Sequence, residues 1–243
     1  MSARHSERLF TPPGMFLREY YRNTLNLVLL VVIPILLIQS FGSALSRLAD
    51  LFSGITMTLN MGKALGALWS AAFLSGIMGF FMMSGAREAD RRLVRAGYHP
   101  VQVVGFRLLT VVVLGAIASM VSYIMLIMQF MPSNLALTFV AIYLAASIYS
   151  AVGILVGSLI PGELEGSFAM LFFFVMDAFI GSPLFGTTSE VFVLLPTYYP
   201  TKILTAMTAQ RAHDPVHWLY VVIYAAVVIA LASYAFYRVA RLR

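Results

Sequence analysis

The sequence predicts an all-α integral membrane protein with six transmembrane helices, and three observations support this fold class. Of the 243 residues, 60% are hydrophobic and 11% are charged, whereas soluble domains carry about 25% charged residues. Uncharged stretches of about 20 residues recur along the chain, and each is long enough to cross the hydrocarbon core as a helix. These stretches lack the alternation of apolar and polar residues typical of membrane β-barrels, so they predict helices.

The boundaries of the spans follow from the charged residues and from one turn. Residues 108–162 contain no charge but are too long for one helix, and Met131, Pro132, Ser133 and Asn134 interrupt them. This tetrapeptide is typical of a tight turn, so the stretch predicts two antiparallel spans. No repeat divides the chain, and a single transmembrane domain is expected over residues 1–243. The predicted spans are 24–45, 64–86, 106–130, 135–160, 166–185 and 217–238.

The distribution of Lys and Arg predicts which side of the membrane each loop faces. Twelve of the 16 basic residues fall on the side of both termini and the loop around residue 90. Both termini are therefore expected in the cytoplasm, with several crossings of the cell (plasma or inner) membrane. The first apolar run follows a long polar leader, so the N-terminus is expected to be retained. The net charge of +6 is attributed to orientation, and no nucleic-acid partner is expected.

Residues 15–22 are predicted to form a short interfacial elbow helix ahead of the first span. Pro12, Pro13 and Gly14 punctuate the chain, and a helix can begin directly after them. The aromatic and apolar side chains of residues 15–22 share one face, and the charged ones fall largely on the other. This pattern is typical of a helix in the headgroup plane. The alternative is an irregular leader.

A charged segment between spans two and three is the main candidate for a cytoplasmic docking site. Helix formers dominate residues 87–96, and Gly97 and Pro100 then supply a stop. A plain connector needs only about 2–8 residues, and charges of both signs can orient a partner. The alternative is a solvated loop that only satisfies orientation. The candidate docking residues are Arg87, Glu88, Asp90, Arg91, Arg92, Leu93 and Arg95.

Two acidic residues, Glu163 and Glu165, lie on the predicted cytoplasmic loop between spans four and five. They are candidates for a secondary contact with a basic surface of a cytoplasmic partner. The alternative is that they only end two helices.

Small residues predict close helix packing. Gly62, Gly66 and Ser70 stand four apart, and Gly153 and Gly157 repeat this spacing in the fourth span. Such spacing lets helix backbones approach in lipid. Packing within one chain is the favoured interpretation, and a dimer face is the alternative.

Asp177 is the one ionisable side chain expected near the middle of a span. A charge at the bilayer centre costs about 2.5–3.5 kcal/mol on insertion scales, so it is expected to face protein or water. Asp177 is a candidate for the transport path or a dimer seam. The alternative is a protonated or hydrogen-bonded residue with a structural role.

Residues 191–207 are predicted to form a re-entrant segment on the outer side, between spans five and six. The apolar run at its start is too short to cross the membrane, and Pro196 and Pro200 interrupt it. A partly closed outer gate is the functional interpretation of this segment.

Together these elements resemble the membrane-spanning (permease) subunit of type-two ABC exporters, the ABC-2-type transporter permease family. In that family an elbow helix precedes span one, a charged coupling helix containing a Glu joins spans two and three, and a re-entrant segment lies between spans five and six. The matching pieces are residues 15–22, 87–96 and 191–207, so the resemblance covers nearly the whole chain. Arg87-Glu88 matches the usual charged opening of the coupling helix, whereas Ala89-Asp90 departs from the small-then-hydroxyl pattern.

The resemblance implies two permease subunits, identical or related, above two cytoplasmic ABC ATPase subunits. The chain lacks a glycine-rich phosphate loop ending in Lys-Ser or Lys-Thr. ATP and Mg²⁺ would therefore bind to the partner ATPase, and this chain is expected to bind no cofactor. Aromatic and methionine side chains suit an amphipathic or lipid-like substrate, such as a drug, an antibiotic, a lipid or a lipid-linked glycan.

Other classes of function are weighed against the exporter. An intramembrane protease would need a Ser–His pair, a zinc site or paired aspartates. No His falls in a predicted span and Asp177 has no second aspartate, so no catalytic residue is expected. His213 and His217 stand four apart, but Pro215 between them predicts a helix start, so no metal site is expected.

The main alternative to the exporter is an ATP-independent secondary transporter or channel. The sequence lacks the repeats and the several buried ionisable groups that are typical of carriers. A structural membrane anchor would need neither Asp177 nor a capped outer face.

Overall fold

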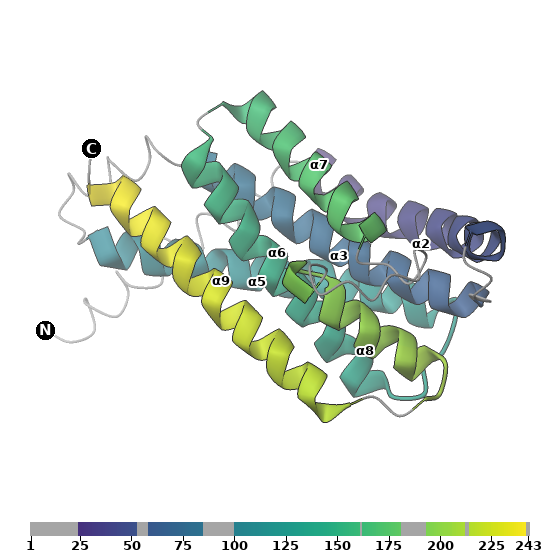
Figure 1. The fold of residues 1–243 in the computed structure, drawn as a ribbon. Coiled ribbons are helices and arrows are strands. Elements are labelled where there is room, and N and C mark those ends of the chain that lie inside the picture. Colours follow the sequence, from purple (N-terminus) through teal and green to yellow (C-terminus); the bar gives the residue numbers. More distant parts are fainter. Residues whose placement is uncertain are drawn as a thin grey trace, which may run out of the picture.

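The computed structural model describes residues 24–52, 58–84, 100–160, 162–180, 193–211 and 214–241. Within these residues the regular elements are all α-helices, which confirms the predicted all-α class for this part of the chain. Figure 1 shows the helices packed side by side in one bundle. The helices are α2 (Thr24–Phe52), α3 (Leu59–Ser84), α5 (Pro100–Ile127), α6 (Leu135–Leu159), α7 (Glu163–Ile180), α8 (Tyr198–Thr208) and α9 (Pro215–Arg241).

Five helices, namely α2, α3, α5, α6 and α9, are long and apolar enough to cross a membrane, judged by length and composition. At about 1.5 Å per residue they match or exceed the roughly 30 Å of a hydrocarbon core. The chain is therefore a multi-pass membrane protein. Helix α7 is not among the five, because its 18 residues include three acids, Glu163, Glu165 and Asp177. A sixth span at residues 166–185 remains a prediction.

Several helices extend beyond the spans predicted for them, and α2 and α5 do so furthest. Helix α2 continues to Phe52 rather than ending near residue 45, and α5 begins at Pro100 rather than near residue 106. The extension of α2 includes the charged residues Arg47 and Asp50, and the extension of α5 includes Pro100, Gln102 and Gly105 but no charge. Charge marks where a helix leaves hydrocarbon, but the backbone hydrogen bonds of a helix do not require apolar side chains. The helices therefore continue past the apolar stretches.

Helix α3 lies at the centre of the bundle and packs against α2, α5 and α6 (Figure 1). In its most apolar stretch of 18 residues, 78% of the residues are buried, a larger share than in the corresponding stretch of any other candidate span. Its largest buried side chains are Trp69 and Phe80. Phe41 of α2 meets the Trp69 ring edge-on, with centroids 5.1 Å apart. The other helices are therefore arranged around α3.

Glycines allow the helix backbones to approach α3 closely. A Cβ at Gly66 would lie 2.8 Å from the Leu37 carbonyl oxygen of α2. On α6, a Cβ at Gly157 would lie 2.9 Å from the Phe80 carbonyl oxygen, and a Cβ at Gly153 would clash with the Gly76 carbonyl oxygen. Such short distances leave no space for a side chain. These three glycines therefore lie at helix contacts within one chain.

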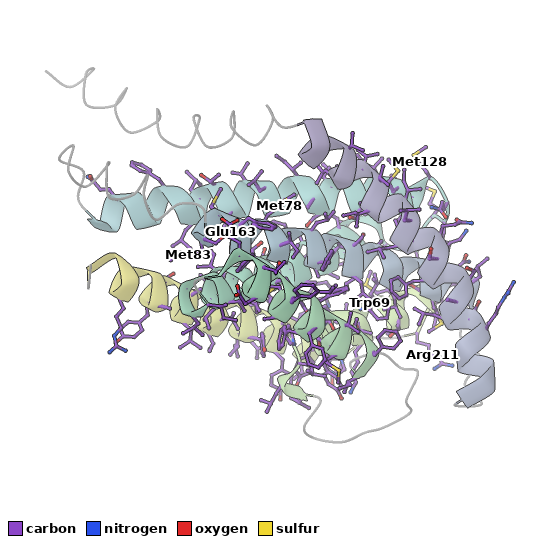
Figure 2. All side chains as sticks on the ribbon, turned by 90° about the horizontal axis from the view of Figure 1, so that it is seen from above. Trp69, Met78, Met83, Met128, Glu163 and Arg211 are labelled. Atoms are coloured by element: carbon purple, nitrogen blue, oxygen red, sulfur yellow. The ribbon has the colours of Figure 1, made fainter. Side chains whose placement is uncertain are left out.

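One end of the bundle, the α8 end, contains α8 and the turn between α5 and α6. This turn was predicted, and Asn134 caps α6 by accepting a hydrogen bond from the Leu137 N–H at 3.0 Å. The Ser133 hydroxyl donates to the Met207 carbonyl of α8 at 3.2 Å. Figure 2 shows Arg211 toward the α8 end and Glu163, at the start of α7, toward the opposite end.

Several predicted elements lie outside the described residues. They include the elbow helix at 15–22 and the first two residues of the segment 191–207. The whole candidate docking set also lies there, namely Arg87, Glu88, Asp90, Arg91, Arg92, Leu93 and Arg95.

Candidate functional site at the α8 end

Asp177, Tyr149 and Thr197 form a buried polar contact between three helices, which we call the Asp177 cluster. Asp177 lies in the last turn of α7, Tyr149 in the second half of α6, and Thr197 directly before α8. The Tyr149 hydroxyl donates to Asp177 Oδ2. The Thr197 N–H donates to the same carboxylate, with distances of 3.3 and 3.4 Å to its two oxygens. All three residues are 0% exposed, so the carboxylate is enclosed by this chain alone.

The ring of Tyr149 is fixed by its neighbours on two helices. On one side, a Cβ at Gly76 of α3 would lie 3.1 Å from Tyr149 Cδ1, so the missing side chain leaves room for the ring. On the other side, Phe174 of α7 packs edge-on against the ring with centroids 5.8 Å apart. Packing by α3 and α7 therefore helps to hold the hydroxyl at Asp177.

Asp177 lies in the last described turn of α7, about 21 Å along the helix axis from Glu163. The predicted span 166–185 continues into residues 181–185, which lie outside the described residues, so the expected position of Asp177 near the middle of a span stays a prediction. Helix α7 itself begins at Glu163 rather than at residue 166. Acidic residues are favourable in the first turn of a helix, where the dipole is positive. Both Glu163 and Glu165 lie in this first turn.

The surroundings of Asp177 can offset the cost of burying its charge. That cost is about 2.5–3.5 kcal/mol on insertion scales. Hydrogen bonds to a charged group contribute about 1.5–3 kcal/mol each, and a helix N-terminus near an anion adds about 0.3–1 kcal/mol. The Thr197 side chain accepts no capping hydrogen bond at the start of α8. The Asp177 carboxylate instead accepts a hydrogen bond from the Thr197 N–H at this helix end. The free energy contributed by two hydrogen bonds and by the α8 N-terminus is thus of the same magnitude as the cost of burying the charge.

Two hydroxyls on α8 and its cap are buried without a hydrogen-bond partner. Thr197 Oγ1 and Thr201 Oγ1 are both unsatisfied, and their residues are 0% and 2% exposed. Residues four apart lie on the same face of a helix, so both hydroxyls are enclosed on the side of α8 that faces the bundle. A buried polar group without a partner costs about 1–3 kcal/mol.

Two further hydrogen bonds attach the α8 segment, defined as residues 193–211, to the long helices. The Tyr224 hydroxyl of α9 donates to the Leu194 carbonyl at 2.9 Å. At the other end of the segment, the Ser133 hydroxyl donates to the Met207 carbonyl. Between them, Ile203, Leu204 and Met207 are buried against the bundle. The segment is therefore held by polar contacts at both ends and by apolar contacts in the middle.

An aromatic cluster covers the outer part of α8 and the start of α9. Tyr199 packs on Tyr220 and His217, with ring centroids 5.0 and 5.7 Å apart. Lys202 Nζ lies 4.4 Å from the centre of the Tyr198 ring. Burial raises the pKa of Tyr199, and the neighbouring Tyr220 and Tyr198 add to this effect. Aromatic residues of this kind are typical of the membrane–water interface.

The remaining candidate residues do not belong to the Asp177 cluster. Glu163 and Glu165 are exposed at the opposite end of α7. Gly153 and Gly157 lie at the contact between α6 and α3. His213 lies outside the described residues. In the part of the chain that the structure describes, no three His, Asp or Glu side chains form a metal-binding group.

Sequence reasoning identified Asp177 but missed its partners, Tyr149 and Thr197. One signal for Tyr149 was available, because a tyrosine inside a long apolar helix usually needs a hydrogen-bond partner. Thr197 offered no comparable signal, since its contribution comes from a backbone N–H.

Comparison with known proteins gives no assignment, because neither the protein-family models nor the curated proteins yield a match to this chain.

Proposed function

We propose that this chain is the permease subunit of an ATP-driven exporter of the type-two ABC class. It would move an amphipathic or lipid-like substrate out of the cytoplasm, with hydrolysis performed by a separate ATPase subunit. A second permease subunit, identical or related, would complete the path. The chain itself would bind no ATP, because it lacks the phosphate loop that this requires.

The order of the helices is the observation that supports this proposal best. The described part of the chain contains six helices of 18 residues or more, and in the sequence the charged residues 87–95 lie between α3 and α5. The short helix α8 stands between α7 and α9 at one end of the bundle (Figure 1). A charged cytoplasmic segment between spans two and three, with a short outer helix before the last span, is the arrangement expected of such a permease.

We propose that the protein lies in the cell (plasma or inner) membrane. Both termini and residues 87–95 would face the cytoplasm. The α8 end would then face outward. The excess of Lys and Arg on the opposite side supports this assignment, because basic residues favour cytoplasmic loops. On this orientation the Asp177 cluster lies in the outer half of the protein.

The identity of the bound partner tests the proposal directly. We expect an ABC ATPase to purify with the chain from native membranes solubilised in mild detergent. Reconstituted vesicles containing both proteins should transport substrate only with ATP. Transport by the chain alone, without ATP, would instead support a secondary transporter or channel.

Charge reversal tests the role of the docking residues. The double substitution Glu88→Arg with Arg91→Glu should abolish stimulation of the partner ATPase, because both charges that orient docking are inverted. Arg211→Glu is the matched control, since it reverses an exposed charge at the opposite end of the bundle. Normal stimulation in the double variant would contradict the docking assignment.

A further inference from the structure

We infer that a buried water molecule bridges α3 and α6 in the middle of the bundle, held by the Ser75 and Ser150 hydroxyls in the space beside Gly115 of α5. This hydration site is separate from the Asp177 cluster. It depends neither on an ATPase partner nor on the transport of a substrate.

Three helices meet at this site. A Cβ built on Gly115 of α5 would lie 3.2 Å from Ser150 Oγ of α6 and 3.6 Å from Ser75 Oγ of α3. Both hydroxyls therefore point toward the space beside Gly115, where this residue has no side chain. All three residues are buried, and each lies in the middle third of its helix. A small molecule in this space would contact α3, α5 and α6 together.

The two hydroxyls differ in the hydrogen bonds that they make. Ser150 Oγ donates its proton to the Ala146 carbonyl at 2.9 Å, so its oxygen is left only to accept. Ser75 Oγ is 0% exposed and has no hydrogen-bond partner among the described residues. Buried polar groups are almost always bonded to protein or to ordered water, so Ser75 requires an explanation. A water molecule supplies one, because it can accept the Ser75 proton and donate to Ser150 Oγ.

A second pair of serines shows how helices α3 and α5 are joined where two hydroxyls meet directly. Ser70 Oγ of α3 and Ser122 Oγ of α5 are hydrogen-bonded at 3.0 Å, and both are buried. Ser75 lies five residues further along α3, where α5 presents Gly115 in place of a hydroxyl. The direct bond between side chains is therefore absent at Ser75, and a bridging molecule takes its place.

The chemistry of the site favours a neutral ligand. Along the described parts of α3, α5 and α6, the nearest charged residues are Lys63 and Arg107, more than two helical turns from Ser75 and Gly115. An ion without a countercharge in an apolar interior carries a large desolvation cost. Water carries no such cost, and buried waters typically make two to four hydrogen bonds to polar groups. The two serine oxygens meet the lower end of that range.

The sign of a stability change tests the site. Ser75→Ala removes one of the two groups that hold the water, so the melting temperature of the chain in nanodiscs should fall by about 2–4 °C. If the hydroxyl had no ligand, removing it would be neutral or stabilising, because a buried group without a partner would be lost. Ser233→Ala is the matched control, since this serine donates to a carbonyl of its own helix on exposed α9. It should leave the melting temperature nearly unchanged.

A second variant fills the space itself. Gly115→Ala places a methyl group between the hydroxyls and should displace the water, so it should also lower the melting temperature. Because both variants lose the same water, Ser75→Ala should have little further effect in the Gly115→Ala background. Gly105→Ala is the control on the same helix, because its added Cβ meets nothing within 4 Å.

Crystals grown in a lipid mesophase, at a resolution that shows ordered water, test the site directly. The natural chain should give a density peak about 2.7–3.2 Å from both Ser75 Oγ and Ser150 Oγ. The Gly115→Ala crystals should lack this peak. The inference is overturned by a natural chain without the peak, or by a Ser75→Ala chain that melts at or above the natural temperature.

Discussion

Tyr149 on α6 donates a hydrogen bond to Asp177 on α7, and both side chains are fully buried. The two residues are 28 positions apart in the chain, on two consecutive helices. It gives the acidic group a neutral donor in an apolar environment. In the described part of the chain, the carboxylate accepts hydrogen bonds from the Tyr149 hydroxyl and from the Thr197 N–H.

Removing the Tyr149 hydroxyl should destabilise the protein. Tyr149→Phe leaves the ring in place but deprives a buried carboxylate of one donor, so we expect a loss of about 1–3 kcal/mol. Thermal unfolding in nanodiscs, followed by tryptophan fluorescence, measures the change. Tyr234→Phe is the control, because Tyr234 is 64% exposed and should tolerate the change. Equal melting temperatures for the two variants would contradict a structural role for the bond.

Adding one methyl group at the contact between α3 and α6 should be costly. Gly153→Ala forces a Cβ against the Gly76 carbonyl oxygen, and neither backbone can move without shifting a whole helix. We expect a destabilisation of about 1–3 kcal/mol or more. Gly105→Ala on α5 is the matched control, because nothing lies within 4 Å of its added Cβ. That variant should be neutral or stabilised by about 0.5–1 kcal/mol, as for Gly in a helix interior.

The cap of α6 makes a smaller and reversible contribution. Asn134→Ala removes the acceptor for the Leu137 N–H and should cost about 1 kcal/mol. Asn134→Asp keeps a side-chain oxygen at the same place and should restore most of that stability. Thermal unfolding of the two variants under the same conditions compares them. A destabilisation in Asn134→Asp equal to that in Asn134→Ala would show that the cap bond is unimportant.

Labelling from one side of the membrane tests the proposed orientation. Arg211→Cys and Glu163→Cys introduce single thiols at exposed positions near opposite ends of the bundle (Figure 2). In intact cells, an impermeant maleimide should label Arg211→Cys, and Glu163→Cys should react only after the membrane is opened. The reverse pattern would place the termini outside and would exclude docking of a cytoplasmic ATPase at residues 87–95.

The long helices could be predicted from the sequence because each depends on a local property, an uncharged stretch of sufficient length. The turn before Leu135 was predicted for the same reason, since Pro132 and Asn134 act within a few residues. The helix α8 also falls within the predicted segment 191–207, apart from its last residue. The extent of α2 to Phe52 was not predicted, because the charged residues Arg47 and Asp50 end the uncharged stretch.

The Asp177 cluster could be predicted only in part. The cost of a charge in an apolar span singled out Asp177 without any structural knowledge. Its partners depend on how α6, α7 and α8 pack, and this packing is set by distant residues such as Gly76 and Phe174. A backbone N–H such as that of Thr197 carries no sequence signature. The expected position of Asp177 near the middle of a span stays a prediction, because residues 181–185 of that span lie outside the described residues.

The glycine contacts between α3 and α6 limit how the protein can move. If one helix slid along the other, residues with a Cβ would replace glycines opposite carbonyl oxygens such as those of Gly76 and Phe80. The two helices are therefore coupled as a rigid body. Helix α7 has a much narrower attachment, since it packs mainly on α3 and α6. In any conformational change, α3 and α6 would keep their relative position, and the peripheral helices would move against them.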